Sequence, residues 1–165
     1  MRSVIVEALA KDSPLVLYPL TEPTGSTSAA TVVDGPAYPL TLRSLGSGGL
    51  FEFGNASGPA TDSASVPTWT PLTNSSGLYL TGTIPPAGGH ANQNMVLEAV
   101  FSTVSGTDQV VAMLDDTQGN SLSIEITADG YVKAVQTYAG MVLSEAVTAN
   151  TWDDGNPHHV SVVVS

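Results

Sequence analysis

Hydrophobic positions in the second half of the chain alternate with polar ones, which is the pattern of β-strands with one buried face. At 122–126, for example, Leu and Ile alternate with Ser and Glu. Such stretches follow one another without a helical pattern between them, so the sequence predicts antiparallel pairing. The predicted strands are 95–104, 109–114, 122–126, 131–138, 141–147 and 160–164.

Turn signals separate these strands. The run from Asp115 to Asn120 combines Asp, Gly and Asn, which favour turns. Asp129-Gly130 is a strong hairpin signal, and Ala139-Gly140 marks a further turn. The sequence therefore predicts a run of hairpins.

The first half of the chain has a weaker pattern. Apolar residues within 4–10 are spaced as in a short helix, which Pro14 ends. A buried strand is predicted at 15–18, weak strands near 38–43 and 49–53, and a short strand at 78–80. The stretches 21–37 and 54–77 are predicted to be loops rich in Thr, Ser, Gly and Pro. Loops of that length usually carry function or form an interaction surface.

The composition agrees with an all-β domain. The chain has 165 residues, 42% of them hydrophobic and 12% charged, and it contains 18 Ser, 18 Thr, 16 Gly and 11 Pro. This length fits one domain with a real core. We expect an antiparallel β-sandwich over 15–165, preceded by a helix and lead-in over 1–14.

The charge balance excludes several partners. Four basic residues against 15 acidic ones give a net charge of −11, which argues against binding to nucleic acid or to anionic membranes. No apolar stretch approaches the roughly 20 residues of a membrane span, so we expect no membrane insertion. The absence of cysteine excludes disulfides and thiolate metal sites. No secretion signal is recognisable at residues 1–7.

Four segments together resemble the LamG-like domain, a jelly roll of the concanavalin A type. The segment 5–22 resembles the family's short helix, "D-S-P" and following strand, and 25–34 resembles its "S-G-T-T-A-x-D" loop. The segment 95–101 is similar to the strand "T-L-E-A-W-F", and 152–160 to "W-x-x-G-x-W-H-H-V". Val100 and Pro157 replace aromatic residues of those patterns.

The resemblance implies a concanavalin A-like jelly roll. In that family, further strands normally follow the "H-H-V-x-V" strand. Missing closing strands would leave unpaired sheet edges. We therefore expect either a longer protein or a neighbouring chain that supplies the strands.

Catalytic arrangements are not recognisable. Glucanases with this fold carry paired carboxylates, but Glu98 and Glu125 stand isolated on their strands. No G-x-S-x-G elbow accompanies the many serines. His158 and His159 are adjacent on a strand and point to opposite faces, so they do not share a ligand. We expect no enzymatic activity.

Acidic turns offer candidate calcium ligands. Calcium takes six to eight oxygen ligands, often from loops. Asp115, Asp116 and Asn120 lie in one predicted turn, and Asp34 matches a loop aspartate of the LamG-like family. Another cluster lies at 153–156. The alternative is that these residues form turns by bonding their own backbone. No other cofactor is indicated.

Trp69 is the candidate contact residue. It lies in the long stretch 54–77, flanked by Thr68 and Thr70 and followed by Asn74. Such aromatic and polar groups suit a glycan, and aromatic anchors also dominate subunit contacts. Trp152 is expected in the core.

Together these features predict a structural or adhesion module. The resemblance and the lack of a secretion signal fit a phage minor tail protein, made in the host cytoplasm and carried on the virion. Its partners would be other tail subunits, copies of itself in a homo-oligomer, or host-surface glycans. The alternative is an extracellular or cell-surface carbohydrate-binding module of a larger bacterial surface protein or secreted glycosidase.

Overall fold

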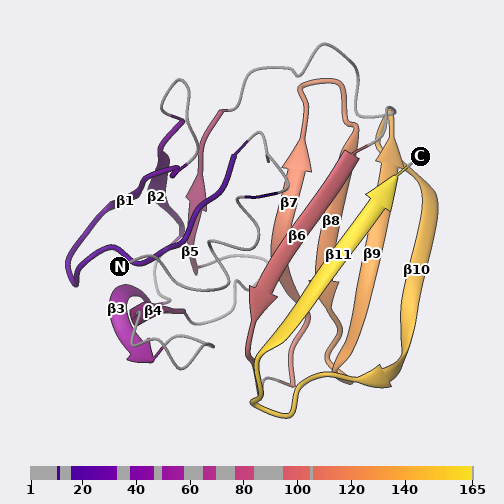
Figure 1. Ribbon diagram of the computed structural model, residues 1–165. Helices are drawn as coiled ribbons and strands as arrows, with labels where there is room; N and C mark the ends of the chain where they lie inside the picture. The colour runs from indigo at the N-terminus through magenta and orange to yellow at the C-terminus, as the bar shows by residue number, and fades with distance from the viewer. Residues whose placement is uncertain are drawn as a thin grey trace. The chain divides into compact units, whose positions relative to one another are not determined.

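The computed structural model describes residues 11, 16–32, 38–46, 50–57, 65–69, 77–83, 95–104 and 106–164 (Figure 1). The chain divides into two compact units, Met1–Ala87 and Gly88–Ser165. Every regular element in the described residues is a strand, and all strand pairs are antiparallel. No helix in those residues is long and apolar enough to cross a membrane. The predicted helix at 4–10 and the boundary after residue 14 lie outside the described residues.

The second unit contains two antiparallel sheets. Its four-stranded sheet has the order β10-β9-β8-β7, and its two-stranded sheet pairs β11 with β6. The strands are β6 (Met95–Phe101), β7 (Gln109–Asp115), β8 (Ser121–Ile126), β9 (Tyr131–Tyr138), β10 (Met141–Thr151) and β11 (His158–Val164). All six strands predicted for this part of the sequence are confirmed, although β6 ends three residues earlier than predicted and β10 ends four residues later.

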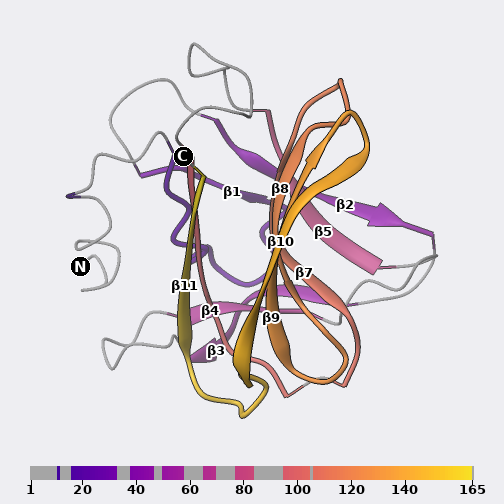
Figure 2. The ribbon, with the colours of Figure 1, turned by 90° about the vertical axis from the view of Figure 1, so that its right-hand side faces the viewer.

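The two sheets of this unit share one core in a sandwich-like arrangement. Ile124 and Ile126 of β8, Val132 of β9 and Phe101 of β6 are buried together. Leu97 and Ala99 from β6, Val160 and Val162 from β11, and Val111 and Trp152 pack against them. Figure 2 shows β6 and β11 as one layer and β7 to β10 as the other. The period-2 alternation of β8 places its three large apolar side chains on the shared face.

Two hairpins of the four-stranded sheet close with similar three-residue loops. In the first loop the amide of Asp116 donates to the carbonyl of Asn120, and in the second that of Thr127 donates to Tyr131. Gly119 and Gly130 adopt φ values of 80° and 85° at the last loop position, a conformation that glycine adopts without strain. The Asp129-Gly130 hairpin is thus confirmed.

The first unit has two small sheets. β1 (Ser28–Ala29), β2 (Leu40–Leu45) and β5 (Gly77–Thr81) form one sheet in the order β1-β2-β5. β3 (Phe51–Ser57) and β4 (Ser65–Trp69) form the other. The predicted strands near 38–43, 49–53 and 78–80 are confirmed as β2, β3 and β5.

Three predictions for this unit are wrong in part. Val16–Tyr18 forms no strand, because Leu17 makes isolated bonds to Val32 and the Thr31 side chain rather than a ladder. The predicted loop 21–37 contains β1, and 54–77 contains β4 and the ends of two other strands. Gly and Pro concealed β4 and the second half of β3. Gly54 (φ 70°) lies within an irregularity of the pairing, and Pro67 is compatible with an edge strand.

Candidate functional site

Trp69 stacks on Phe51, and we call these two residues the aromatic pair. They lie opposite each other in the β3–β4 register, with ring centroids 6.5 Å apart and planes 22° from parallel. Phe53 supports Phe51 edge-on at 5.1 Å and is only 1% exposed. Trp69 itself is 37% exposed. The prediction that Trp69 lies in a loop is therefore wrong. Trp69 belongs to the β3–β4 hairpin, in which the buried Phe53 packs against Phe51.

The other predicted contact residues are only partly described. Thr68 lies opposite Glu52 in the register of β3 and β4 and is half-buried. Thr70 and Asn74 lie outside the described residues, and so does the candidate metal ligand Asp34. The structure therefore brings together Phe51, Thr68 and Trp69 on one hairpin.

The candidate calcium ligands Asp116 and Asn120 are bonded to each other. One carboxylate oxygen of Asp116 accepts from the amides of Gln118 (2.8 Å) and Asn120 (3.0 Å). The other accepts from the Asn120 side chain at 2.7 Å. Asp115 is exposed at the end of β7. These contacts support the turn-forming alternative, and the described residues contain no group of three or more metal-ligating side chains. Calcium stays a prediction.

The second acidic cluster holds a histidine. Asp154 Oδ1 lies 2.7 Å from Nε2 of His158, and both of its oxygens accept hydrogen bonds from Asn156. The Asn156 bonds, followed by the His158 contact, lower the Asp154 pKa from 3.8 to about 2. Trp152 meets the His158 ring edge-on at 4.6 Å. His158 thus faces inward while His159 is exposed, which confirms that they point to opposite faces.

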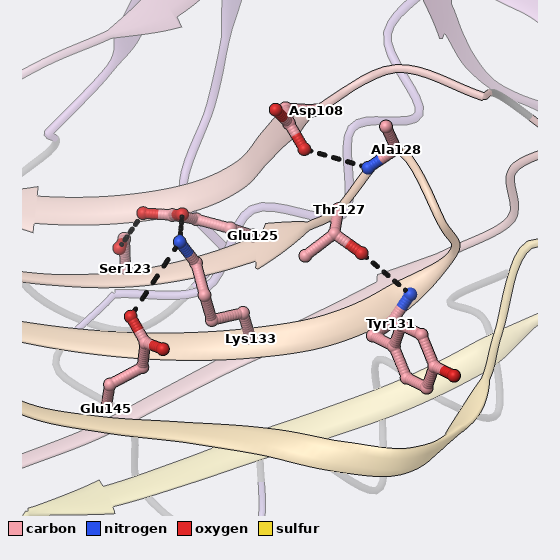
Figure 3. Close-up of polar contacts among 8 residues, drawn as sticks. All are labelled: Asp108, Ser123, Glu125, Thr127, Ala128, Tyr131, Lys133 and Glu145. Atoms are coloured by element: carbon pink, nitrogen blue, oxygen red, sulfur yellow. Dashed lines mark hydrogen bonds and ion pairs between the residues drawn. The ribbon is translucent and has the colours of Figure 1, made fainter.

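The carboxylates Glu125 and Glu145 share one lysine on the outer face of the four-stranded sheet (Figure 3). Lys133 Nζ lies 2.9 Å from Glu125 and 4.0 Å from Glu145. The hydrogen bond to Glu125 raises the Lys133 pKa, and the buried Ser123 donates to Glu125 at 2.7 Å. An ammonium therefore lies between two carboxylates that a glycosidase would need as separate acid and nucleophile. Glu98 likewise accepts from Ser161 and contacts His159.

Sequence reasoning did not identify Phe51 or Lys133 as site residues. The predicted strand at 49–53 supplied one half of the β3–β4 hairpin. Alternation over Ser65–Trp69 was the signal for the other half, and the glycines and prolines around it obscured that signal. Lys133 is the only lysine or arginine among 95–165. Its position two residues after Tyr131, on a strand paired with β8, could have placed it opposite Glu125.

Comparisons of the chain with protein-family models, curated proteins and solved structures found no match.

Proposed function

We propose that this protein is a non-enzymatic adhesion module that contacts carbohydrate through its aromatic pair. The observation that carries the proposal is the exposed Trp69 ring, held parallel to Phe51 by a β-hairpin. A ring fixed in this way offers apolar contact area without loss of side-chain freedom on binding. The apolar face of a sugar ring suits such a surface, because aromatic rings combine a large apolar area with a negative π face.

The support beneath the aromatic pair favours a permanent binding surface. Phe53 is buried and packs edge-on against Phe51, so Phe51 is fixed before a ligand arrives. Pre-organisation of this kind raises affinity by reducing the entropy lost on binding. Single sites of this size bind weakly, and repetition of the module on one particle would multiply their strength.

We further propose that the sheets belong to a concanavalin A-like jelly roll, and that the module works on a virion as a phage minor tail protein. The two layers with a shared core in the second unit support the jelly roll. The acidic, Ser- and Thr-rich composition suits an exposed particle protein. The four-segment resemblance to the LamG-like family supports the tail assignment.

Binding to an array of immobilised neutral and anionic oligosaccharides tests the glycan role. We expect the full chain, displayed in many copies on a bead, to bind a subset of the array. Trp69→Ala should weaken that binding by at least about tenfold, the loss typical of an aromatic anchor. Trp69→Phe should retain part of it, because a ring remains beside Phe51.

Tyr79→Ala is the matched control. Tyr79 is 38% exposed, close to the 37% of Trp69, and it lies on β5 of the same unit. We expect Tyr79→Ala to bind like the unmodified chain. Equal losses in both variants would contradict a site at the aromatic pair, and failure of the bead-displayed protein to bind any oligosaccharide would contradict the glycan role.

A further inference from the structure

The edge strand β11 lacks the usual protection against pairing with another strand. It pairs with β6 over seven residues without a register shift. Within the described part of the chain, no strand pairs along its other side. Its sequence, His-His-Val-Ser-Val-Val-Val, contains no Lys, carboxylate or proline. Edge strands that must stay unpaired usually carry such residues or a bulge.

A groove lies between β11 and the inner face of the four-stranded sheet. It has a volume of about 300 Å³ and is lined by Val162–Val164 on one side and Ser144–Ala146 of β10 on the other. Leu122, Ala134 and Gln136 form its floor. β10 is itself an edge strand; its pairing with β9 is regular over Ser144–Val147, between two register shifts. Within the described residues, the open side of this unit therefore presents two edges without a strand partner, with the apolar Ala146 and Val162 between them.

One layer of this unit has four strands and the other has two. A second copy can extend both layers to the same number of strands. We propose that two copies of this chain join about a two-fold axis that lies between the layers, parallel to the strands. β10 of each copy then fills the groove of the other and pairs with β11 there. Each four-stranded layer continues the two-stranded layer of the other copy, which gives two layers of six strands.

The strand directions and side-chain faces agree with this joint. β10 and β11 run in opposite directions (Figure 1), and rotation about an axis parallel to the strands preserves that relation, so the new pairs are antiparallel. The rotation also exchanges the layers, so residues that face inward in one copy face inward in the joint. Because the axis shifts nothing along the strands, Ser144–Ala146 of one copy lie beside Val162–Val164 of the other.

The charges also permit two acidic chains to meet here. β11 has no carboxylate, and β10 has only Glu145, which would lie beside the exposed Val163 of the other copy. Glu98, opposite Ser161 on β6, lies about two strand spacings, roughly 10 Å, from the incoming β10. At that distance salt largely screens the repulsion. About a dozen residues from each copy take part, fewer than in a standard interface, so we expect a dissociation constant on the order of 10 μM.

Sedimentation velocity over a range of concentrations of the full chain tests the joint. We expect the mass to rise from 16.9 kDa to twice that value and no further, because a two-fold interface closes at two copies. Val163→Glu should keep the protein monomeric, since it places a carboxylate beside Glu145 of the other copy. Val163 is 67% exposed, so this change leaves the fold intact.

Two further variants distinguish the joint from a general effect of charge. Val96→Glu adds the same charge on β6 directly opposite Val163, at a residue 56% exposed, and should dimerise like the unmodified chain. Glu145→Lys combined with Val163→Glu should restore the dimer. A monomer at about 100 μM, a mass above two copies, an equal loss in Val96→Glu, or no rescue in the double variant would each overturn the proposal.

Discussion

The side-chain oxygen of Asn120 accepts a hydrogen bond from the backbone amide of Ala139, 3.0 Å away. This bond links the loop between β7 and β8 to the turn between β9 and β10. A second link runs from the Gly140 amide to the Gly119 carbonyl. Asn120 is 4% exposed, and its amide nitrogen donates to Asp116. The buried Asn120 side chain thus forms hydrogen bonds with residues of both loops at this end of the sheet.

Replacement of Asn120 by alanine should destabilise the protein. The change removes the partly buried bond from the Ala139 amide and the side-chain bond to the Asp116 carboxylate, a charged acceptor, which together cost about 1–3 kcal/mol. Chemical denaturation of the two proteins measures the difference. Gln118→Ala is the control, because Gln118 is exposed in the same loop and contributes only its backbone amide to Asp116. Equal effects of the two changes would contradict a special role for Asn120.

Ala139→Asn should stabilise the protein. Ala139 and Gly140 have φ values of 50° and 78°, which correspond to the two-residue turn that Asn-Gly adopts most readily. The left-handed conformation costs an alanine about 1–2 kcal/mol, so we expect a gain of about 1 kcal/mol. Ala128→Asn, at an exposed loop residue without a positive φ, should give no such gain. Thermal unfolding of both variants measures the two effects.

The hairpins of the second unit could be predicted because their signals are local. Alternation over Leu122–Ile126 and the Asp129-Gly130 pair specify a strand and a turn without reference to distant residues. The partners of Asn120 could not be predicted in this way. They depend on how the β7–β8 loop lies beside the β9–β10 turn, and that follows from sheet order rather than from sequence spacing.

The first unit was harder to predict because its strands are short and contain strand-breaking residues. Pro67 and Gly54 argue against strands, yet β3 and β4 tolerate them since a two-stranded sheet has only edge strands. Because β4 was not predicted, the candidate site was predicted only in part. Trp69 was recognisable as a contact residue, but its partner Phe51 was not, because their pairing requires the hairpin.

Gly130→Ala should destabilise the protein by more than its φ angle alone explains. A Cβ at Gly130 would lie 2.4 Å from the Asp153 carboxylate, in addition to the strain at φ 85°. Gly140→Ala is the control, since φ there is 78° and no atom beyond the adjacent residues lies within 4 Å of the added carbon. We expect a loss of about 1–2 kcal/mol in the control and a larger loss at Gly130. Asp153→Ala should remove the difference, and its persistence in that background would contradict the steric explanation.

Asp154 should make the folded protein sensitive to strong acid. The Asp154 pKa is lowered from 3.8 to about 2 in the folded protein. On acidification, Asp154 is therefore protonated at a higher pH in the unfolded chain than in the folded one. The stability from the ionised carboxylate is therefore present above about pH 4 and lost as the pH falls toward 2. Asp154→Asn should lose less stability than the unmodified chain over that interval. Asp129→Asn, the same change at an exposed loop residue, should not; parallel denaturation curves for all three proteins would contradict the prediction.

Lys133 should stabilise the outer face of the sheet mainly through Glu125. Lys133→Met leaves Glu125 and Glu145 without the cation between them, and we expect a loss of about 1 kcal/mol at neutral pH, the upper range for partly exposed ion pairs. Double-mutant cycles with Glu125→Gln and Glu145→Gln separate the two contacts. The Glu125 cycle should show the larger coupling energy, because its oxygen lies 2.9 Å from Nζ while that of Glu145 lies at 4.0 Å. Both couplings should shrink in high salt. Equal couplings would mean that Lys133 acts through the general field of the acidic sheet rather than through the close pair, and a coupling insensitive to salt would point to packing of the lysine stem.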